Sequence, residues 1–144
     1  MCRTFSKAYG LGGLRVGFGV GHPEVIDLMN RVRQPFNVSS LALAAAAAAL
    51  EDDEFLARTV DINQRGMVQL TEAFKELGLE WIPSDGNFVT VRFADAAGVN
   101  TALLKAGVIV RPIAGYGLPE WLRVSIGLPE ENQRFIDVLK SILA

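Results

Sequence analysis

The sequence predicts an α/β chain that ends in a small α+β lobe, and three observations support this fold class. A long amphipathic stretch runs from about residue 53 to Leu77, with apolar residues three or four positions apart. After Gly78 the pattern changes to the alternation that is typical of strands. The order strand, helix, strand, strand and helix then indicates a small sheet with helices on one face. We therefore expect a division into residues 1–62 and 63–144.

The first half is expected to be mainly helical. A short strand over residues 14–20 precedes a helix that begins at Pro23, reaches about Arg33 and is followed by the helix-breaking segment 34–37. His22 directly precedes Pro23 and belongs to the capping region of that helix. Ser39 or Ser40 caps a second helix over residues 41–50, and Asp52 or Asp53 caps the long third helix, which ends at Gly78.

The second half alternates between strands and helices. Residues 87–93 form a strand that follows a turn at residues 83–86, and residues 99–106 form a short helix that stops at Gly107. Two further strands are expected over residues 108–111 and 121–126. The final helix begins at Pro129, and its apolar stripe consists of Phe135, Val138, Leu139 and Ile142.

Composition excludes several classes of function. A net charge of −2 gives no basic surface for nucleic acid or for a membrane. The single cysteine, Cys2, excludes an intramolecular disulfide and fits a reducing compartment, and we expect it to be a small buried residue. The single histidine excludes a His-rich metal site. The apolar run Leu41–Leu50 is too short to span a bilayer, so we expect a cytoplasmic protein.

Lys7 lies between hydroxyl residues and a glycine-rich, cationic turn. Thr4 and Ser6 are close to it in sequence, and Arg15 follows the glycines of residues 10–13. A lysine amine forms Schiff bases with carbonyl compounds, while hydroxyl and guanidinium groups are natural phosphate ligands. Glycines let backbone N–H groups approach an anion. The residues alone also allow Lys7 to be an ordinary solvated side chain.

The segment Thr4–Gly10, followed by Gly13–Gly17, resembles the pyridoxal-phosphate lysine signature of fold-type-I aminotransferases. Within that superfamily it is most similar to the histidinol-phosphate aminotransferases. The resemblance implies that Lys7 carries the internal aldimine of pyridoxal 5′-phosphate. It also implies that Thr4, Ser6 and Arg15 contact the cofactor phosphate. No metal site is expected, since the sequence has no Cys/His ligand spacing.

Arg111 and Arg123 are the second chemical feature of the sequence. Each lies at the end of, or inside, a short apolar strand, where an unpaired charge is costly. From the residues alone, a structural ion pair is the more common explanation and a ligand site is the other. The segments 110–112, 116–119 and 122–127 resemble the small-domain signature of the same family. That resemblance implies that Arg123 binds the substrate anion and that Arg111 helps to hold the substrate phosphate.

The resemblance covers nearly the whole chain and implies the carboxy-terminal part of a longer enzyme. Residues 1–62 would be the tail of the large cofactor-binding domain with connecting helices, and residues 63–144 the small domain. The implied reaction exchanges an amino group between histidinol phosphate and 2-oxoglutarate, with glutamate as the reverse donor. A homodimer is expected because it is usual for this fold type, and the isolated chain is expected to have little or no activity.

Three other functions stay open at this point. The first is that of the threonine-phosphate decarboxylases, which resemble the same family closely, and the second is a general amino acid aminotransferase. The third belongs to another class, a non-catalytic aminotransferase-like sensor domain of a transcription regulator. Such a regulator would carry a basic DNA-binding domain upstream. The presence of both Arg111 and Arg123 favours the enzyme.

Overall fold

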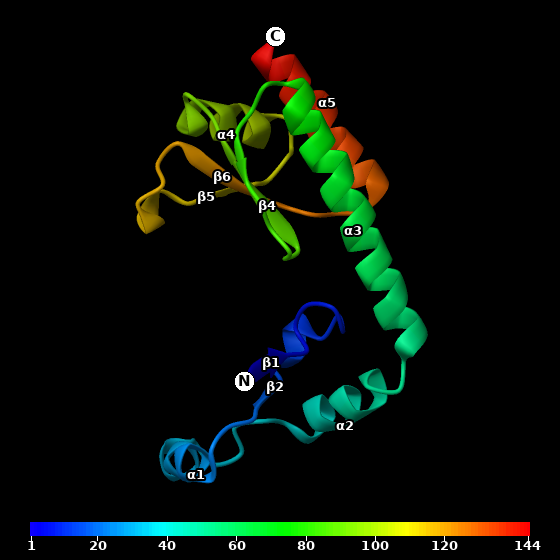
Figure 1. Cartoon of the computed structure of the whole chain (residues 1–144), viewed down its shortest axis with the longest axis vertical. Helices are drawn as coiled ribbons and strands as arrows, with labels where there is room; N and C mark the ends of the chain where they lie inside the picture. Colours follow the sequence, from blue (N-terminus) through cyan, green and yellow to red (C-terminus); the bar gives the residue numbers. More distant parts are fainter. The chain divides into compact units, whose positions relative to one another are not determined.

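The computed structural model describes residues 1–144, which divide into two compact units, Met1–Val60 and Asp61–Ala144. Helix α3 begins in the first unit and continues into the second (Figure 1). The first unit contains β1 (Cys2–Thr4), β2 (Gly17–Gly19), α1 (Pro23–Val32), α2 (Ser40–Ala49) and the start of α3 (Asp53–Glu76).

The helix boundaries of the first unit follow the local signals in the sequence. Pro23 occupies the first turn of α1, and the His22 ring accepts a hydrogen bond from the backbone N–H of Glu24 at 3.4 Å. Of the two candidate serines before α2, Ser39 is the cap, because its hydroxyl accepts from the N–H of Ala42 at 3.2 Å. The strand expected over residues 14–20 is reduced to β2, which pairs antiparallel with β1.

Helix α3 also begins and ends as the sequence predicts. The Asp52 carboxylate accepts from the backbone N–H of Phe55 at 2.9 Å, which identifies the N-terminal cap. Gly78 takes a φ of 67°, and the N–H of Leu79 donates to the carbonyl of Phe74 at 2.9 Å. This is the glycine-terminated helix end in which a left-handed residue closes the last turn.

The second unit is an antiparallel sheet covered by helices. Its strands lie in the order β3-β4-β6-β5, and every neighbouring pair is antiparallel. Helix α5 runs beside α3 (Figure 1), with the amine of Lys140 3.1 Å from the carboxylate of Glu76. The elements are β3 (Trp81–Ile82), β4 (Phe88–Arg92), α4 (Ala96–Lys105), β5 (Arg111–Pro112), β6 (Trp121–Ser125) and α5 (Pro129–Leu143).

One face of this sheet forms the core. Val89 and Val91 of β4 and Leu122 and Val124 of β6 are buried against the helices, while the alternate residues of both strands point to the opposite face. The helices α3, α4 and α5 therefore all cover the same side, as predicted. Their buried contributions are Leu70, Ala73, Phe74, Ala96, Val99, Leu103, Phe135, Ile136 and Leu139.

The strand predicted over residues 108–111 is wrong in most of its length. Only Arg111 and Pro112 pair with β6, and residues 108–110 belong to no strand. Pro112 is the last residue of β5, and a proline is tolerated there because β5 is at the edge of the sheet. A short run of β-branched apolar residues favours a strand but does not supply the pairing partner that makes it one.

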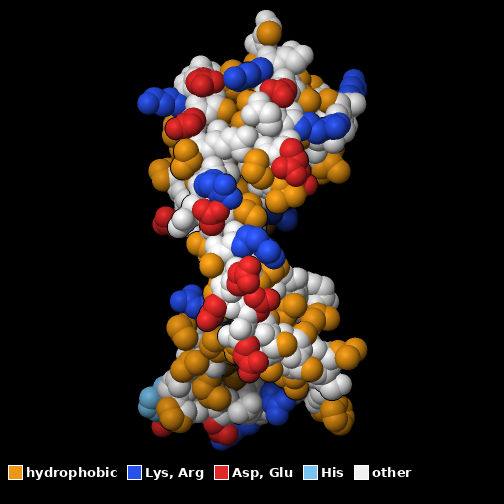
Figure 2. All heavy atoms as spheres, turned by 90° about the vertical axis from the view of Figure 1, so that its right-hand side faces the viewer, with side chains coloured by type: hydrophobic (Ala, Val, Ile, Leu, Met, Phe, Trp, Pro, Cys, Tyr) orange, Lys and Arg blue, Asp and Glu red, His pale blue; other side chains and the backbone are white.

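The first unit exposes much of its apolar surface. Figure 2 shows hydrophobic side chains gathered around the part that carries the single histidine. Val32 is 82% exposed and Phe36 is 98% exposed, and α1 has no buried residue. Cys2 is also exposed, so the expectation that it is buried is wrong, because β1 has no layer packed over it. No helix combines the length and hydrophobicity needed to cross a membrane.

Candidate functional site

The loop that carries Lys7 connects β1 to β2 and is anchored from within. Phe5 and Val16, at its two ends, are 5% and 6% exposed and pack with Ala42 and Ala46 of α2. The backbone N–H of Phe5 donates to the carbonyl of Val16 at 3.1 Å, which closes the loop. Lys7 itself is exposed. The buried residues thus fix the base of the loop and leave its polar residues outside.

Gly17 allows the two strands at the base of this loop to approach each other. A Cβ at this position would lie 2.5 Å from the carbonyl oxygen of Arg3 and 3.3 Å from the Cα of Thr4. Any side chain would therefore force β1 and β2 apart. Gly10 has a different function, since its φ of 70° favours a residue without a Cβ in the turn after Lys7.

The structure brings together the three residues predicted to contact a phosphate. The hydroxyl of Thr4 accepts a hydrogen bond from the backbone N–H of Ser6 at 3.1 Å. The guanidinium of Arg15 donates to the hydroxyl of Ser6 at 3.4 Å and to the carbonyl of Gly12 at 2.9 Å. Arg15 has a left-handed backbone, with φ 53° and ψ 49°, and this conformation accompanies a guanidinium that lies across the loop.

The charge around this loop suits an anion. Neither Lys7 nor Arg15 forms an ion pair with a carboxylate of the chain. The guanidinium of Arg15 is within hydrogen-bonding distance of the Ser6 hydroxyl, and the Thr4 hydroxyl is bonded to the backbone of the same Ser6. These groups lie in the loop of the exposed Lys7, and no carboxylate neutralises the two cations. A phosphate group would take up these donors, so the residues present fit a phosphate-bearing ligand whose reactive end lies near Lys7.

In the second unit, the two predicted substrate-binding arginines lie side by side on the sheet. Arg111 of β5 is directly opposite Arg123 of β6, and Thr90 of β4 is opposite Arg123 on its other side. All three residues are on the face away from the helical core. Like charges that face each other across two strands are destabilising unless an anion joins them.

The surroundings of Arg123 differ from those of another arginine on the same face. Arg92 makes ion pairs with Glu120 at 2.8 Å and Glu80 at 3.1 Å, and its hydrogen bonds to these carboxylates raise the pKa of Arg92. Neither Arg111 nor Arg123 has a carboxylate within 4.0 Å. From the residue types alone, a structural ion pair was the more common explanation for Arg111 and Arg123. The structure has such an ion pair at Arg92 but none at Arg111 or Arg123.

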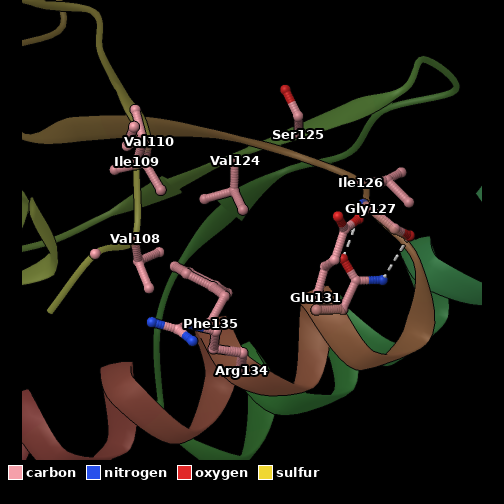
Figure 3. Close-up of a pocket in the computed structure, with 12 residues that line it drawn as sticks. Val108, Ile109, Val110, Val124, Ser125, Ile126, Gly127, Glu131, Arg134 and Phe135 are labelled. Atoms are coloured by element: carbon pink, nitrogen blue, oxygen red, sulfur yellow. Dashed lines mark hydrogen bonds between the residues drawn. The ribbon is translucent and has the colours of Figure 1, made fainter.

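A cavity of about 480 Å³ lies elsewhere in the second unit, between β6, the unpaired segment 107–110 and α5 (Figure 3). Its walls are mainly apolar, and no predicted site residue lines it. Beside it, the buried amide of Asn132 accepts from the N–H of Gly127 at 2.9 Å and donates to the carbonyl of Gly127 at 3.2 Å. The same amide donates to Gln69 of α3 at 3.2 Å. This arrangement joins α3, α5 and the end of β6 and has no chemical groups for catalysis.

No group of three or more His, Cys, Asp or Glu side chains that could hold a metal ion is present. Phe88 lies in the strand that was expected over residues 87–93. In the structure, its ring lies under Arg123, with 4.8 Å between the guanidinium carbon and the ring centroid. The spacing of 35 residues between the two positions gave no indication of this contact, which depends on the register of β4 and β6.

The chain is similar over nearly its whole length to several known enzymes. A histidinol-phosphate aminotransferase from Methylobacillus flagellatus is 66% identical over 141 residues, which are 98% of this chain and 38% of that protein. The structure of histidinol-phosphate aminotransferase from Sinorhizobium meliloti in complex with pyridoxal-5′-phosphate matches 98% of this chain and 41% of that one, with 29% identity and a TM-score of 0.85. L-threonine-O-3-phosphate decarboxylase from Porphyromonas gingivalis matches with 29% identity and a TM-score of 0.86, over 99% of this chain and 46% of that one.

The chain spans about two fifths of the length of the curated relatives it matches. The family model described as "Aminotransferase class I and II" matches residues 1–139, which include the Lys7 loop and both arginines of the sheet. The matched solved structures share the fold of both units. The chain therefore belongs to the class I and II aminotransferase family.

Proposed function

We propose that this chain is part of a pyridoxal-phosphate-dependent aminotransferase that exchanges an amino group between histidinol phosphate and 2-oxoglutarate. The observation that carries the proposal is the grouping of Thr4, Ser6 and Arg15 beside the exposed, unpaired Lys7. The identity of 66% to a histidinol-phosphate aminotransferase supports the choice of substrate. Residues 1–62 would belong to the large cofactor domain and residues 63–144 would be the small domain.

In this proposal, the Lys7 loop binds the cofactor. The hydroxyls of Thr4 and Ser6 and the guanidinium of Arg15 hold its phosphate, and the amine of Lys7 binds its carbonyl carbon covalently. Pyridoxal phosphate, when bound, supplies the electron sink for the reaction. After the amino substrate displaces Lys7, the free amine accepts a proton from the substrate carbon that bears the amino group, holds it and returns it two atoms away.

The substrate anions are assigned to the second unit. Arg111 and Arg123 would bind the phosphate of histidinol phosphate, and the same pair would accept a carboxylate of glutamate or 2-oxoglutarate in the other half of the reaction. Their cross-strand position supports this proposal, since both cations point to one face without a carboxylate partner. A phosphate dianion offers enough oxygen atoms to pair with both guanidiniums.

A phosphothreonine decarboxylase is the second candidate. The Porphyromonas gingivalis decarboxylase has a TM-score of 0.86 to this chain, which is as high as that of the aminotransferase from Sinorhizobium meliloti at 0.85. Both substrates carry a phosphate, so the arginines do not separate the two reactions. The sequence identity favours the aminotransferase, because the relatives at 59–66% identity are histidinol-phosphate aminotransferases.

We also propose that the complete enzyme is a cytoplasmic homodimer with small-molecule substrates. The exposed apolar residues of the first unit support the expectation of a further packing surface, since Val32, Leu41 and Phe36 are each more than three-quarters exposed. Some of this surface would contact the remainder of the polypeptide and some the second subunit.

The first test measures cofactor attachment directly. Pyridoxal phosphate and borohydride are added to the 144-residue chain and, in parallel, to a full-length chimera in which this chain replaces the matching stretch of the Methylobacillus flagellatus enzyme. Peptide mass mapping should find a phosphopyridoxyl group on Lys7 in the chimera, and Lys7→Ala should abolish it. Equal labelling of Lys75, Lys105 and Lys140 would contradict the assignment. Because their amines are also solvent-accessible, these three lysines are the internal controls.

The second test separates the candidate reactions. The chimera is given either histidinol phosphate with 2-oxoglutarate or L-threonine-O-3-phosphate, and glutamate formation and CO₂ release are measured. The proposal predicts glutamate formation with histidinol phosphate and no CO₂ from the phosphothreonine. CO₂ release without glutamate would select the decarboxylase.

A further inference from the structure

The contact between Arg123 and Phe88 joins two neighbouring strands on the outer face of the sheet. Phe88 of β4 is opposite Ser125 of β6, so it is the diagonal neighbour of Arg123. The guanidinium carbon of Arg123 lies 4.8 Å from the centroid of the Phe88 ring. At this distance the negative face of the ring attracts the cation, and the attraction grows when the pair is shielded from water.

Arg123 has no other compensation for its charge within the chain. Its Nε atom is buried and has no hydrogen-bond partner, and no carboxylate lies within 4.0 Å of the side chain. Arg111, opposite on β5, adds a like charge. A half-buried arginine in this position is costly, so its conformation depends on the ring beneath it.

A ring is a different kind of partner from a carboxylate. Glu120 and Glu80 occupy the N–H groups of Arg92, and few remain for another ligand. The face of Phe88 attracts the Arg123 cation without accepting hydrogen bonds from its N–H edge, so those donors stay available for an anion. The ring also restricts the rotation of a long side chain, which lowers the entropy lost when the anion binds.

We propose that Phe88 is a positioning residue that holds the guanidinium of Arg123 in the orientation needed to bind the substrate anion. The inference rests on the proposed function, because it takes Arg123 as the anion-binding residue. It assigns to Phe88 an effect on substrate affinity and none on the chemical step, since Phe88 acts through Arg123. A ring of similar shape should preserve the effect, and an aliphatic side chain of similar volume should not.

The test uses steady-state kinetics of the full-length chimera. Phe88→Leu should raise the KM for histidinol phosphate by about 5- to 30-fold, the range expected for the loss of a cation–π contact. The kcat of Phe88→Leu should differ from that of the parent enzyme by less than about 3-fold. The separate variant Phe88→Tyr should have the KM of the parent enzyme. The inhibition constant of inorganic phosphate should rise in parallel with the KM. The matched control is Trp121→Leu. Trp121 lies in β6 on the same outer face of the sheet, so this variant also removes an aromatic ring from that face but should leave the KM unchanged.

Two further variants separate this inference from the proposed function. If Arg123→Lys leaves both the KM and phosphate inhibition unchanged, Arg123 is not the anion-binding residue and the site assignment fails. If Arg123→Lys raises the KM and Phe88→Leu does not, only the positioning role of Phe88 is overturned. In the double variant Phe88→Leu/Arg123→Lys, the KM for histidinol phosphate should be no higher than in Arg123→Lys alone. A full additional increase would also overturn the positioning role.

Discussion

Gly66 is the position where the structure makes the sharpest prediction about stability. It lies in the middle of α3 and is buried against the end of β6 and the start of α5. A Cβ at this position would lie 2.5 Å from Cγ2 of Ile126 and 2.8 Å from Nδ2 of Asn132. Gly66→Ala should therefore destabilise the second unit, although the same change stabilises most helices.

The sign of the effect follows from two opposing magnitudes. In the interior of an exposed helix, alanine is about 1 kcal/mol more favourable than glycine. Overpacking a close-packed contact costs about 1–3 kcal/mol, and the upper value applies because neither neighbour moves easily. Ile126 is stiff at its branched Cβ, and the amide of Asn132 is held by hydrogen bonds to Gly127 and Gln69. We expect a net loss of about 2 kcal/mol in the free energy of unfolding.

Urea unfolding followed by tryptophan fluorescence measures this loss, since both tryptophans, Trp81 and Trp121, are in the second unit. Ile126→Ala removes the nearer clashing atom and leaves only the clash with Asn132. Gly66→Ala should therefore cost less stability in the Ile126→Ala background than in the parent chain. A Gly66→Ala variant that is more stable than the parent chain would refute the close contact, because only helix propensity would then be at work.

Three further predictions concern the stability of the second unit and are checked by urea unfolding, the first two with a matched control variant. Leu70→Ala should cost about 3 kcal/mol because Leu70 is fully buried, whereas Val68→Ala, at an exposed position of the same helix, should change stability by less than about 0.5 kcal/mol. Asp95→Ala should cost about 1 kcal/mol by removing the cap of α4, and Asp95→Asn should keep most of it. Asn132→Leu should cost about 2 kcal/mol or more by leaving the backbone groups of Gly127 without partners. Equal losses in Leu70→Ala and Val68→Ala, a neutral Asp95→Ala or a neutral Asn132→Leu would each contradict the corresponding contact.

The sequence predicted the elements whose boundaries depend on neighbouring residues. Pro23, Ser39 and Gly78 mark helix ends through contacts within a few positions, and all three do so in the structure. The strands β1 and β3 were not predicted, because they have only three and two residues and exist through pairing with distant segments. The segment 108–110 shows the converse, since its three apolar residues indicate a strand but no strand pairs with them.

The two parts of the candidate site differ in the same way. Thr4, Ser6, Lys7 and Arg15 lie within twelve residues, so a single loop brings them together and the sequence was sufficient to group them. The facing position of Arg111 and Arg123 depends on the register of two strands, which local patterns do not determine. The ring beneath Arg123 depends on a further register and was therefore missed.

Because the backbone of Arg15 is left-handed, selection for stability and selection for cofactor retention should favour different residues at this position. A residue with a Cβ is less stable in this conformation than glycine, by about 1 kcal/mol. A variant library screened only for resistance to heat should therefore enrich Arg15→Gly, whereas a screen for retention of pyridoxal phosphate should discard it. Under the proposed function, heat-stabilised descendants of this chain would then hold the cofactor phosphate less well, for a reason that lies in a single φ angle and not in any altered contact of the core.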